Sequence, residues 1–459
     1  MAYGTYLVVA EAKQLQKIAN AIAKRTDKGA SGDPLVAVSP NRALLGAAVT
    51  ERIAEWDPGK TVAEQLLALG AERVETKSPS QVASLLENRE PSELLLERSD
   101  GGYDMVEDGH DWHIARTRLH EAWDRVGGPG QIDWEGIQVG QIDTGYTEHP
   151  CLGWKNGASS VVNTRDDRNF FYEEMYGEDD RNAWGNRDPY SALDPYTGSA
   201  AGHGTRTGSV LAGFDESVSA RVNPDGGPKL GGYYGAAPKV PYIPIRLYNS
   251  VTIDRAAEAL GDALEYLVKE VRVQVITLSM GAAPLGGLPK KTRDMIDLAY
   301  DRGVIFCCAA GNYVRFVATP AVAPRTIAVG GSAPNDRPWV HSCFGRAVDL
   351  CAPAWPVRRA STTNAGDYVY GPGGGTSYAT PQVAGTAALW LVKHREKLDE
   401  TYPKPWMRVA AFREIVRNTA VPPSGWDTNR YGKGILDAAK VLDEPLPEAD
   451  TLIRDIEAH

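Results

Sequence analysis

From residue 136 onward the sequence alternates between short runs rich in Val and Ile and longer amphipathic segments, and this alternation constrains the fold most strongly. The apolar runs are nearly continuous, which is typical of strands buried on both faces of a parallel sheet. The segments between them have helical periodicity, so we expect helices on both faces. The expected strands are 137–143, 240–247, 273–280, 304–310 and 326–330, and the expected helices are 203–212, 254–271 and 290–302. The predicted class is α/β, a three-layer α/β/α domain with a mostly parallel sheet.

The chain before this domain reads as a separate, small α/β N-terminal domain. Strands are expected at 6–9 and 34–38, and helices at 12–25 and 62–69, the last ending at a glycine. The Gly-containing stretch Arg98-Ser99-Asp100-Gly101-Gly102 is typical of an exposed connection. We therefore predict an N-terminal α/β domain over residues 1–110, a large domain over 111–443 and an acidic C-terminal tail over 444–459.

A long insertion is expected between residues 151 and 201, where Gly, Asn, Asp and Tyr are frequent and no periodicity is visible. Long loops of this kind are usually functional or mobile. Its acidic residues show no regular ligand spacing, so a solvated acidic surface is favoured over a calcium site, and no metal ligand is assigned. These acidic residues are Glu173, Glu174, Glu178, Asp179, Asp180, Asp188 and Asp194.

The composition of the 459-residue chain argues against two classes of partner. A net charge of −10 and dispersed Lys and Arg residues disfavour nucleic acid and anionic membranes. The first residues lack the basic and apolar regions of a signal peptide, and no apolar run approaches the ~20 residues of a membrane span. The five cysteines contain no CxxC pair, so we expect free thiols, with Cys307 and Cys308 on opposite faces of one strand. A cytoplasmic location is the resulting expectation.

Four polar residues follow apolar strands or a glycine loop and are expected at the carboxyl edge of the sheet. They are Asp143, Ser279, Asn312 and Ser377. Ligands of open α/β sheets bind at this edge. Ser377 follows the run Gly373-Gly374-Gly375-Thr376 and opens a helical segment, where free N–H groups favour negative charge. Pro381 is expected in the first turn of that helix, where its missing N–H is harmless.

These residues supply the roles that acyl transfer by a serine requires. A hydroxyl needs a base, and a neutral His is suited to that at neutral pH. His203 lies in Gly202-His203-Gly204-Thr205 at the start of an expected helix. A carboxylate such as that of Asp143 orients the imidazole. The amide of Asn312 and the N–H of Ser377 are candidate donors to a developing oxyanion.

With these motifs in view, the chain resembles the subtilisin-like serine proteases of the subtilase family, of peptidase S8 type. The matching motifs occur in the family's order: Asp143-Thr144-Gly145, Gly202-His203-Gly204-Thr205, Ala309-Ala310-Gly311-Asn312 and Gly375-Thr376-Ser377. Further similarity lies in the lead-in Trp112-His113-Ile114, in Leu278-Ser279-Met280-Gly281 and in the closing stretch around Gly434. The resemblance extends over residues 112–443, so the large domain is predicted to be a peptidase domain.

The resemblance implies a serine endopeptidase with a triad of Asp143, His203 and Ser377 and an oxyanion hole that includes Asn312. It implies that the backbone of residues 279–281 binds a peptide substrate as an added strand. The substrate-binding residues so implied are Ser279, Met280, Gly281, Ala310 and Gly311. No cofactor is required for this chemistry, and a structural calcium ion stays unassigned. In the family, a domain placed like residues 1–110 is often an inhibitory propeptide, which makes this chain a candidate zymogen.

Several residues depart from the family's pattern. Tyr378 replaces the usual Met, Gln382 and Arg206 replace His, and Ala354 replaces Gly. None removes a catalytic group, but family substrate preferences cannot be transferred. The mostly apolar segment 314–321 predicts an apolar specificity pocket, with Arg315 as the exception. Six other histidines (110, 113, 120, 149, 341 and 394) are interpreted as structural or surface residues.

Three hypotheses stay open at this point. The first is an active endopeptidase, and the second is a catalytically silent protease-like module that binds or regulates. The third is a latent protease that needs a partner to displace residues 1–110. An aspartic protease is disfavoured because Asp143-Thr144-Gly145 occurs once, whereas that class needs two carboxylates that share a proton.

Overall fold

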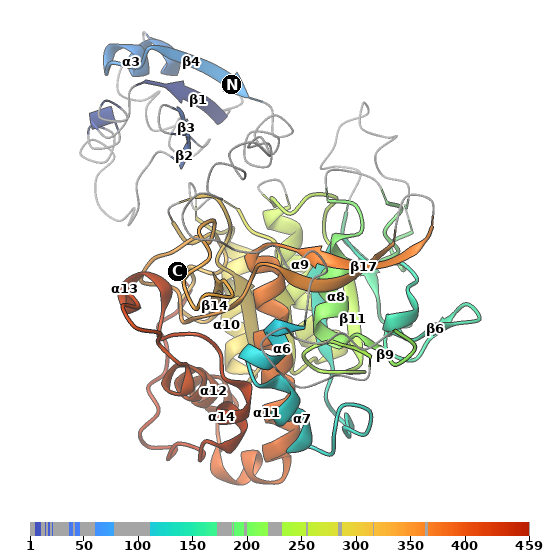
Figure 1. The fold of residues 1–459 in the computed structure, drawn as a ribbon. Helices are drawn as coiled ribbons and strands as arrows, with labels where there is room; N and C mark the ends of the chain where they lie inside the picture. The colour runs from blue at the N-terminus through green and yellow to red at the C-terminus, as the bar shows by residue number, and fades with distance from the viewer. Residues whose placement is uncertain are drawn as a thin grey trace.

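A computed structural model describes residues 5–10, 14, 17–18, 21, 36–39, 42–45, 60–77, 111–171, 186, 188–196, 200–218, 232–253, 256–282, 287–314, 316–362 and 366–458. Within these residues the chain forms two main sheets, one from the first 77 residues and one from the large domain (Figure 1). No helix of the described residues is long and apolar enough to cross a membrane.

The large domain is built on a seven-stranded sheet in the order β15-β14-β13-β12-β5-β11-β8. Every neighbouring pair in this sheet is parallel. The strands are β5 (Val139–Asp143), β8 (Arg168–Asn169), β11 (Tyr242–Arg246), β12 (Val275–Leu278), β13 (Ile305–Ala309), β14 (Ile327–Ser332) and β15 (Leu350–Pro353). The predicted α/β/α class with a mostly parallel sheet is confirmed.

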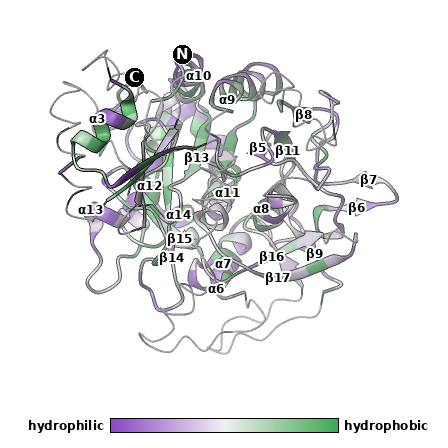
Figure 2. Ribbon diagram, turned by 90° about the horizontal axis from the view of Figure 1, so that it is seen from above, coloured by the Kyte–Doolittle hydropathy of each residue, from purple (hydrophilic) through white to green (hydrophobic). Residues whose placement is uncertain are grey.

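Helices cover both faces of this sheet, and each face has its own hydrophobic core. One core contains α8 (His203–Ala212) and the long α11 (Thr376–Thr401), which runs through the middle of the domain in Figure 1. The other contains α9 (Ala257–Glu265) and α10 (Lys290–Asp301). Figure 2 shows hydrophobic residues concentrated on the strands and on the helix faces toward them. Cys307 lies in the first core and Cys308 in the second, so the prediction of opposite faces is confirmed.

The predicted strands and helices of the sheet occur at the expected places; the strands are shorter than expected except β14, which has six residues instead of five. The helix expected at 254–271 is α9 followed by a π-helical turn, η5 (Tyr266–Val271), and residues 254–255 lie outside the described part. Two edge strands were not expected: β15 is four residues long, and β8 lies within the predicted insertion. β8 has too few residues for a periodicity signal, and the apolar run of β15 ends at Pro353 after three residues.

An antiparallel hairpin leads into the glycine loop before α11. Its strands are β16 (Val357–Thr362) and β17 (Tyr368–Gly373), which pair from Val357 with Gly373 to Thr362 with Tyr368. His149 lies against this hairpin, with its ring 5.0 Å from the Tyr368 ring and 5.3 Å from the Tyr370 ring. Burial lowers the pKa of His149 to about 4.

The remaining elements of the large domain are short or lie at its ends. They are α6 (Trp112–Arg116), α7 (Leu119–Asp124), η2 (Pro150–Leu152), β6 (Trp154–Lys155), β7 (Ala158–Ser159), β9 (Phe214–Asp215), β10 (Tyr233–Tyr234), α12 (Trp406–Thr419), α13 (Thr428–Tyr431) and α14 (Ala438–Asp443). The tail after α14 is fixed by Arg325, whose guanidinium binds the Asp455 carbonyl and lies 2.8 Å from Asp297.

The N-terminal unit has a four-stranded antiparallel sheet in the order β2-β3-β1-β4. Its elements are β1 (Thr5–Val9), β2 (Val36–Ser39), β3 (Arg42–Leu45), α3 (Val62–Ala68) and β4 (Arg73–Lys77). Thr61 and Glu64 form a capping box that begins α3. Of the predicted helix 12–25, residues 14, 17, 18 and 21 are helical, and the other residues lie outside the described part, as does the connection at 98–102.

Candidate active site

The candidate site begins where β5 and α8 meet. Asp143 is the last residue of β5, and His203 is the first residue of α8. Gly202 adopts the left-handed conformation (φ 69°) that turns the chain into α8. The helix start lies directly on the loop after β5, because a Cβ atom at Gly204 would be 1.9 Å from the Gly145 carbonyl oxygen. Only glycine at position 204 allows this approach.

This approach brings the predicted carboxylate and imidazole together. The Nδ1 atom of His203 lies 2.7 Å from Oδ1 of Asp143. The carboxylate is 1% exposed and the histidine 8%. Since Asp143 engages Nδ1, the proton of the neutral ring is held on that nitrogen, and Nε2 is left to accept a proton. The N–H of Thr144 also donates to Oδ1, at 2.7 Å.

Asp194, which lies in the insertion, is hydrogen-bonded to Thr144, the residue after Asp143, and to Gly202, the residue before His203. Its carboxylate accepts hydrogen bonds from the Thr144 hydroxyl, the Gly202 N–H and the Tyr196 N–H at 2.7–2.9 Å. Asp194 is 6% exposed, and burial raises the pKa of its carboxyl. The prediction that the insertion's acidic residues form a solvated surface is therefore wrong for Asp194. Nothing in its local sequence distinguishes it from Asp188, which is exposed.

A buried arginine adds positive charge behind the same loops. Arg246 ends β11, directly beside Asp143 in the sheet register, and is 1% exposed. It donates to the Asn186 carbonyl at 3.2 Å, and its guanidinium stacks on the Phe171 ring. Burial lowers the pKa of Arg246 to about 10, and the nearby Asp194 carboxylate opposes this shift. Asn186 and Phe171, which belong to the predicted insertion, thus contact Arg246 beside Asp143.

Ser377 is the second residue of α11, at the helix N-terminus where it was expected. Its hydroxyl donates to the Ser279 carbonyl at 3.1 Å, and the Ser279 hydroxyl donates to the Ser377 carbonyl at 2.8 Å. Pro381 is the sixth residue of α11, so its expected place in the first turn is wrong. Because proline has no N–H, the Ser377 carbonyl lacks its usual helical donor, and the Ser279 hydroxyl takes that place.

The start of α11 lies beside the start of α8. The Tyr378 ring is 6.3 Å from the His203 ring and packs with Val210 and Val357. In the described structure the Ser377 hydroxyl is bonded to Ser279 and not to His203. The predicted contact between Ser377 and His203 is therefore not present in this arrangement of the side chains.

Asn312 is held with its amide oxygen against Thr376, the first residue of α11. Its Oδ1 atom accepts bonds from the N–H and the hydroxyl of Thr376, both at 2.9 Å. Because the N–H of Thr376 is a donor, the atom of the Asn312 amide that faces it is the oxygen. The Nδ2 atom therefore lies on the side of the amide group away from Thr376. A Cβ atom at Gly375 would lie 3.5 Å from Asn312 Nδ2 and 3.5 Å from Ser377 N. The Asn312 Nδ2 atom and the Ser377 backbone nitrogen thus lie near the same point, close to the Ser377 Cβ atom.

The predicted substrate-binding segments lie at the same edge. The strand end at Gly281 is already bonded: its N–H donates to the Val251 carbonyl, and its carbonyl accepts from the Ile253 N–H. Gly311 (φ 99°) donates its N–H to the Thr376 hydroxyl. Ala318 lies between the two glycines, since added Cβ atoms at Gly281 and Gly311 would be 3.0 and 3.1 Å from its methyl group.

Segment 314–321 supplies buried apolar side chains next to these glycines. Val317, Ala318 and Ala321 are 5%, 7% and 1% exposed. Arg315 lies outside the described residues. Met280 and Ala310 are buried in the second core. An apolar specificity pocket stays a prediction that these contacts support.

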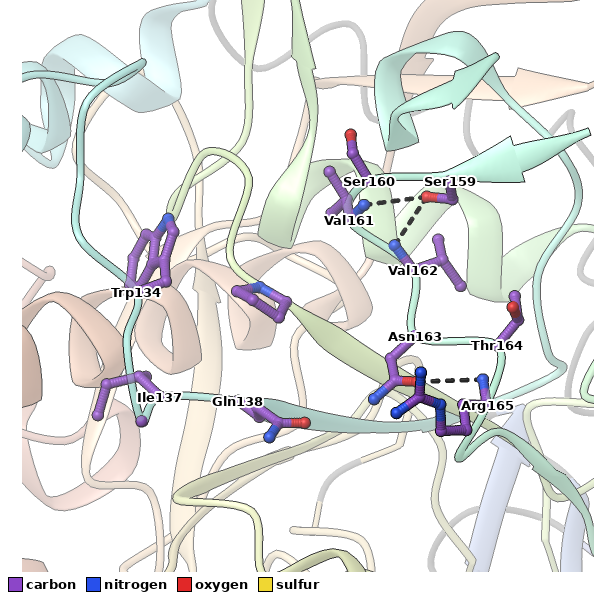
Figure 3. A pocket seen from close by; sticks show the side chains of 12 residues that line it. Trp134, Ile137, Gln138, Ser159, Ser160, Val161, Val162, Asn163, Thr164 and Arg165 are labelled. Carbon is purple, nitrogen blue, oxygen red and sulfur yellow. Dashed lines mark hydrogen bonds between the residues drawn. The ribbon is translucent and has the colours of Figure 1, made fainter. Parts of the chain in front are cut away.

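A separate cavity of about 530 Å³ lies at the opposite edge of the sheet (Figure 3). It is lined by Ile137 and Gln138, which precede β5, by Pro241, which precedes β11, and by residues 159–165 and Trp134. Because Asp143 ends β5, this cavity is at the far end of the strand from the candidate site. Within the described residues, no group of three or more His, Cys, Asp or Glu side chains is placed to hold a metal ion.

Comparisons with known proteins agree with this geometry. A sequence model of the subtilase family matches residues 135–437. Subtilisin Savinase from Lederbergia lenta is 26% identical over 329 residues, which cover 71% of this chain and 96% of that protein. Subtilisin NAT from Bacillus subtilis subsp. natto is 27% identical over 307 residues, 66% of this chain and 64% of that protein.

Solved structures show the same fold. A protease from Pseudoalteromonas arctica PAMC 21717 superimposes with a TM-score of 0.54 at 21% identity, covering 74% of this chain and 99% of that one. MycP1 from the ESX-1 type VII secretion system superimposes with a TM-score of 0.52 at 18% identity, covering 75% of this chain and 89% of that one.

Proposed function

This chain belongs to the subtilase family of serine proteases, and from that premise we propose that it is an endopeptidase with Asp143, His203 and Ser377 as its catalytic triad. The observation that carries the proposal is the buried 2.7 Å contact between Asp143 and His203 at the sheet edge where the helix of Ser377 begins. An imidazole held in this way by a carboxylate is suited to accept a proton from a serine and to carry the resulting positive charge.

In the proposed reaction the Ser377 hydroxyl turns from the Ser279 carbonyl toward Nε2 of His203. His203 takes the proton as Ser377 Oγ attacks the carbonyl carbon of the scissile peptide bond. The oxyanion accepts hydrogen bonds from Asn312 Nδ2 and the Ser377 N–H, whose nitrogen atoms lie near the same point beside Gly375. His203 then gives the proton to the leaving amine, and water hydrolyses the acyl-enzyme by the same steps.

A fluorophosphonate probe tests the nucleophile. We expect covalent labelling of the wild-type chain at Ser377 and none of Ser377→Ala. Ser160→Ala, which changes an exposed serine far from the site, is the matched control and is expected to label normally. Labelling of Ser377→Ala at the wild-type rate would refute the proposal. A wild-type chain that neither labels nor cleaves casein, with or without cell extract, would favour the silent binding module instead.

We further propose that the chain before residue 111 is a latency domain. This is supported by its separate antiparallel sheet, which pairs with no strand of the large domain among the described residues. Intact-mass measurement of wild type beside Ser377→Ala separates the cases. A mass loss only in wild type means self-processing, and an unchanged mass with activity means a retained domain. Activity that appears only with added extract would indicate a regulatory partner.

A further inference from the structure

The Asp143 carboxylate has a third hydrogen-bond partner, at the oxygen atom that does not bind His203. Its Oδ1 atom is bonded to His203 Nδ1 and the Thr144 N–H, each at 2.7 Å. Its Oδ2 atom accepts a bond from the Thr207 hydroxyl at 3.0 Å. Among the described residues, Thr207 is the one hydrogen-bond partner of Oδ2. A buried carboxylate depends on such donors to stay ionised.

The direction of the Thr207 hydroxyl is set by Gln141. The Nε2 group of Gln141 donates to the Gly204 carbonyl at 2.7 Å and to Thr207 Oγ1 at 2.8 Å. A carbonyl only accepts, so the atom facing Gly204 is the nitrogen, and Thr207 Oγ1 must be an acceptor from it. The single proton of the hydroxyl is then available for an acceptor of its own.

Three acceptors lie within reach of that proton. They are Asp143 Oδ2 at 3.0 Å and the carbonyls of His203 and Gly204, both at 3.2 Å. The two carbonyl contacts are the ordinary back-bonds of a threonine inside a helix. The carboxylate is the nearest acceptor and the charged one, and a charge-assisted bond is the stronger. The proton is therefore expected on the bond to Asp143.

Packing alone does not explain why the buried residues at positions 141 and 207, Gln141 and Thr207, are polar. Gln141 is 2% exposed and Thr207 is 1% exposed, in the contact between β5 and α8. The Gln141 Oε1 atom is buried with no hydrogen-bond partner among the described residues. A leucine and a valine would fill the same space and remove the unsatisfied Gln141 oxygen, but they would leave Oδ2 of Asp143 without its hydrogen-bond donor.

We propose that Thr207, oriented by Gln141, is a positioning residue that holds the Asp143 carboxylate against His203. The proposal rests on the proposed triad. It extends the triad by two hydrogen bonds, from Gln141 to Thr207 and from Thr207 to Asp143, which we call the relay. The positive end of the Thr207 hydroxyl dipole lies next to the carboxylate. Removing it leaves the carboxylate less neutralised, which favours the protonated imidazole. Loss of the hydroxyl is therefore expected to make His203 hold its proton to higher pH.

The test compares Thr207→Val, which removes the hydroxyl at nearly constant volume, with Thr207→Ser, which keeps it. NMR titration of the His203 ring is done on the full chain in a Ser377→Ala background, so the result does not depend on catalysis. We expect the titration midpoint to rise by about half a pH unit in Thr207→Val. Thr207→Ser is expected to restore the wild-type midpoint, and Gln141→Met to give a smaller rise.

Fluorophosphonate labelling of the chain with Ser377 intact gives the kinetic readout. Below the His203 titration midpoint, Thr207→Val is expected to label about threefold more slowly than the wild-type chain. This factor corresponds to a rise of half a pH unit in the midpoint. An unchanged midpoint in Thr207→Val, or an equal shift in Thr207→Ser, would overturn the relay. Absence of labelling in the wild-type chain would instead overturn the proposed function, while the NMR titration still decides the relay.

Discussion

Replacing Gly204 with alanine is expected to disable the site by separating the two segments that carry its charged pair. Gly204 follows His203 on α8, and Gly145 lies two residues after Asp143. A Cβ atom at position 204 would lie 1.9 Å from the carbonyl oxygen of Gly145 and 3.0 Å from its carbonyl carbon. Both atoms belong to the backbone, so no side chain can move aside to relieve the clash.

The size of the effect follows from this overlap. Real Cβ contacts essentially never fall below 3.0 Å, so from 1.9 Å the two backbones must part by at least about 1.1 Å. The same backbones hold Asp143 and His203 at 2.7 Å. Misplacing catalytic groups by about 1 Å costs about 10²-fold in rate. The overpacking itself is expected to cost about 1–3 kcal/mol of unfolding free energy, so a weakened but folded chain should remain.

The assay is kcat/KM on a chromogenic peptide substrate, with urea unfolding of the same samples. Gly371→Ala is the matched control, because a Cβ atom at that position in β17 would meet no heavy atom within 4 Å. We expect at least about 100-fold loss for Gly204→Ala and near wild-type activity for Gly371→Ala. Activity of Gly204→Ala above about a tenth of wild type, with native-like unfolding, would show that the close approach does not position the pair.

Three further predictions concern other contacts. Asn312→Ala is expected to lower kcat by about 10²–10³-fold with little change in KM, because one oxyanion donor is lost; an equal loss in Thr376→Val by steady-state kinetics would point to packing instead. His149 takes up its proton near pH 6.5 when unfolded but only near pH 4 when folded, so its contribution to stability is present above pH 6.5 and is lost as pH falls toward 4. Between pH 7.5 and 4.5 this amounts to about 2.5 kcal/mol, and urea unfolding of His149→Asn should show a pH dependence smaller by that amount. Arg325→Met breaks the buried contact with Asp297 and the bonds to the tail, so we expect a loss of about 3 kcal/mol and faster cleavage of residues 444–458 by an added protease; unchanged cleavage would show that the tail is held by other contacts.

The parallel sheet could be predicted because its strands are buried on both faces and therefore read as continuous apolar runs. Edge strand β8 escaped prediction because two residues have no periodicity, and β15 because its apolar run, Leu350-Cys351-Ala352, ends after three residues at a proline, whereas β12 lies in a longer apolar segment. The one-turn error at Pro381 has a different cause. A proline in the second turn needs another donor for the Ser377 carbonyl, and the Ser279 hydroxyl that supplies it lies 98 residues away in the sequence.

Residues around the candidate pair were harder to foresee than the pair itself. Asp143 ends an apolar strand two residues before a glycine, and His203 begins a helix between two glycines, so their local sequence marks them. Asp194 and Thr207 sit in unremarkable sequence, one among the acidic residues of an irregular insertion and the other inside a helix. Their hydrogen bonds to Thr144, Gly202 and Asp143 arise only when β5, α8 and the insertion pack together.

By itself, the sequence determined the α/β class, the order of the main strands and helices, and the polar residues expected at the carboxyl edge of the sheet. These features depend on hydrophobic periodicity and on the backbone preferences of glycine and proline, which act over a few residues. Only the tertiary structure decided which atoms meet there. It set the 2.7 Å contact of Asp143 with His203, the reciprocal bonds of Ser279 with Ser377 and the burial of Asp194. Those contacts join segments 50 to 98 residues apart, and they depend on how closely the backbones approach, which no local pattern encodes.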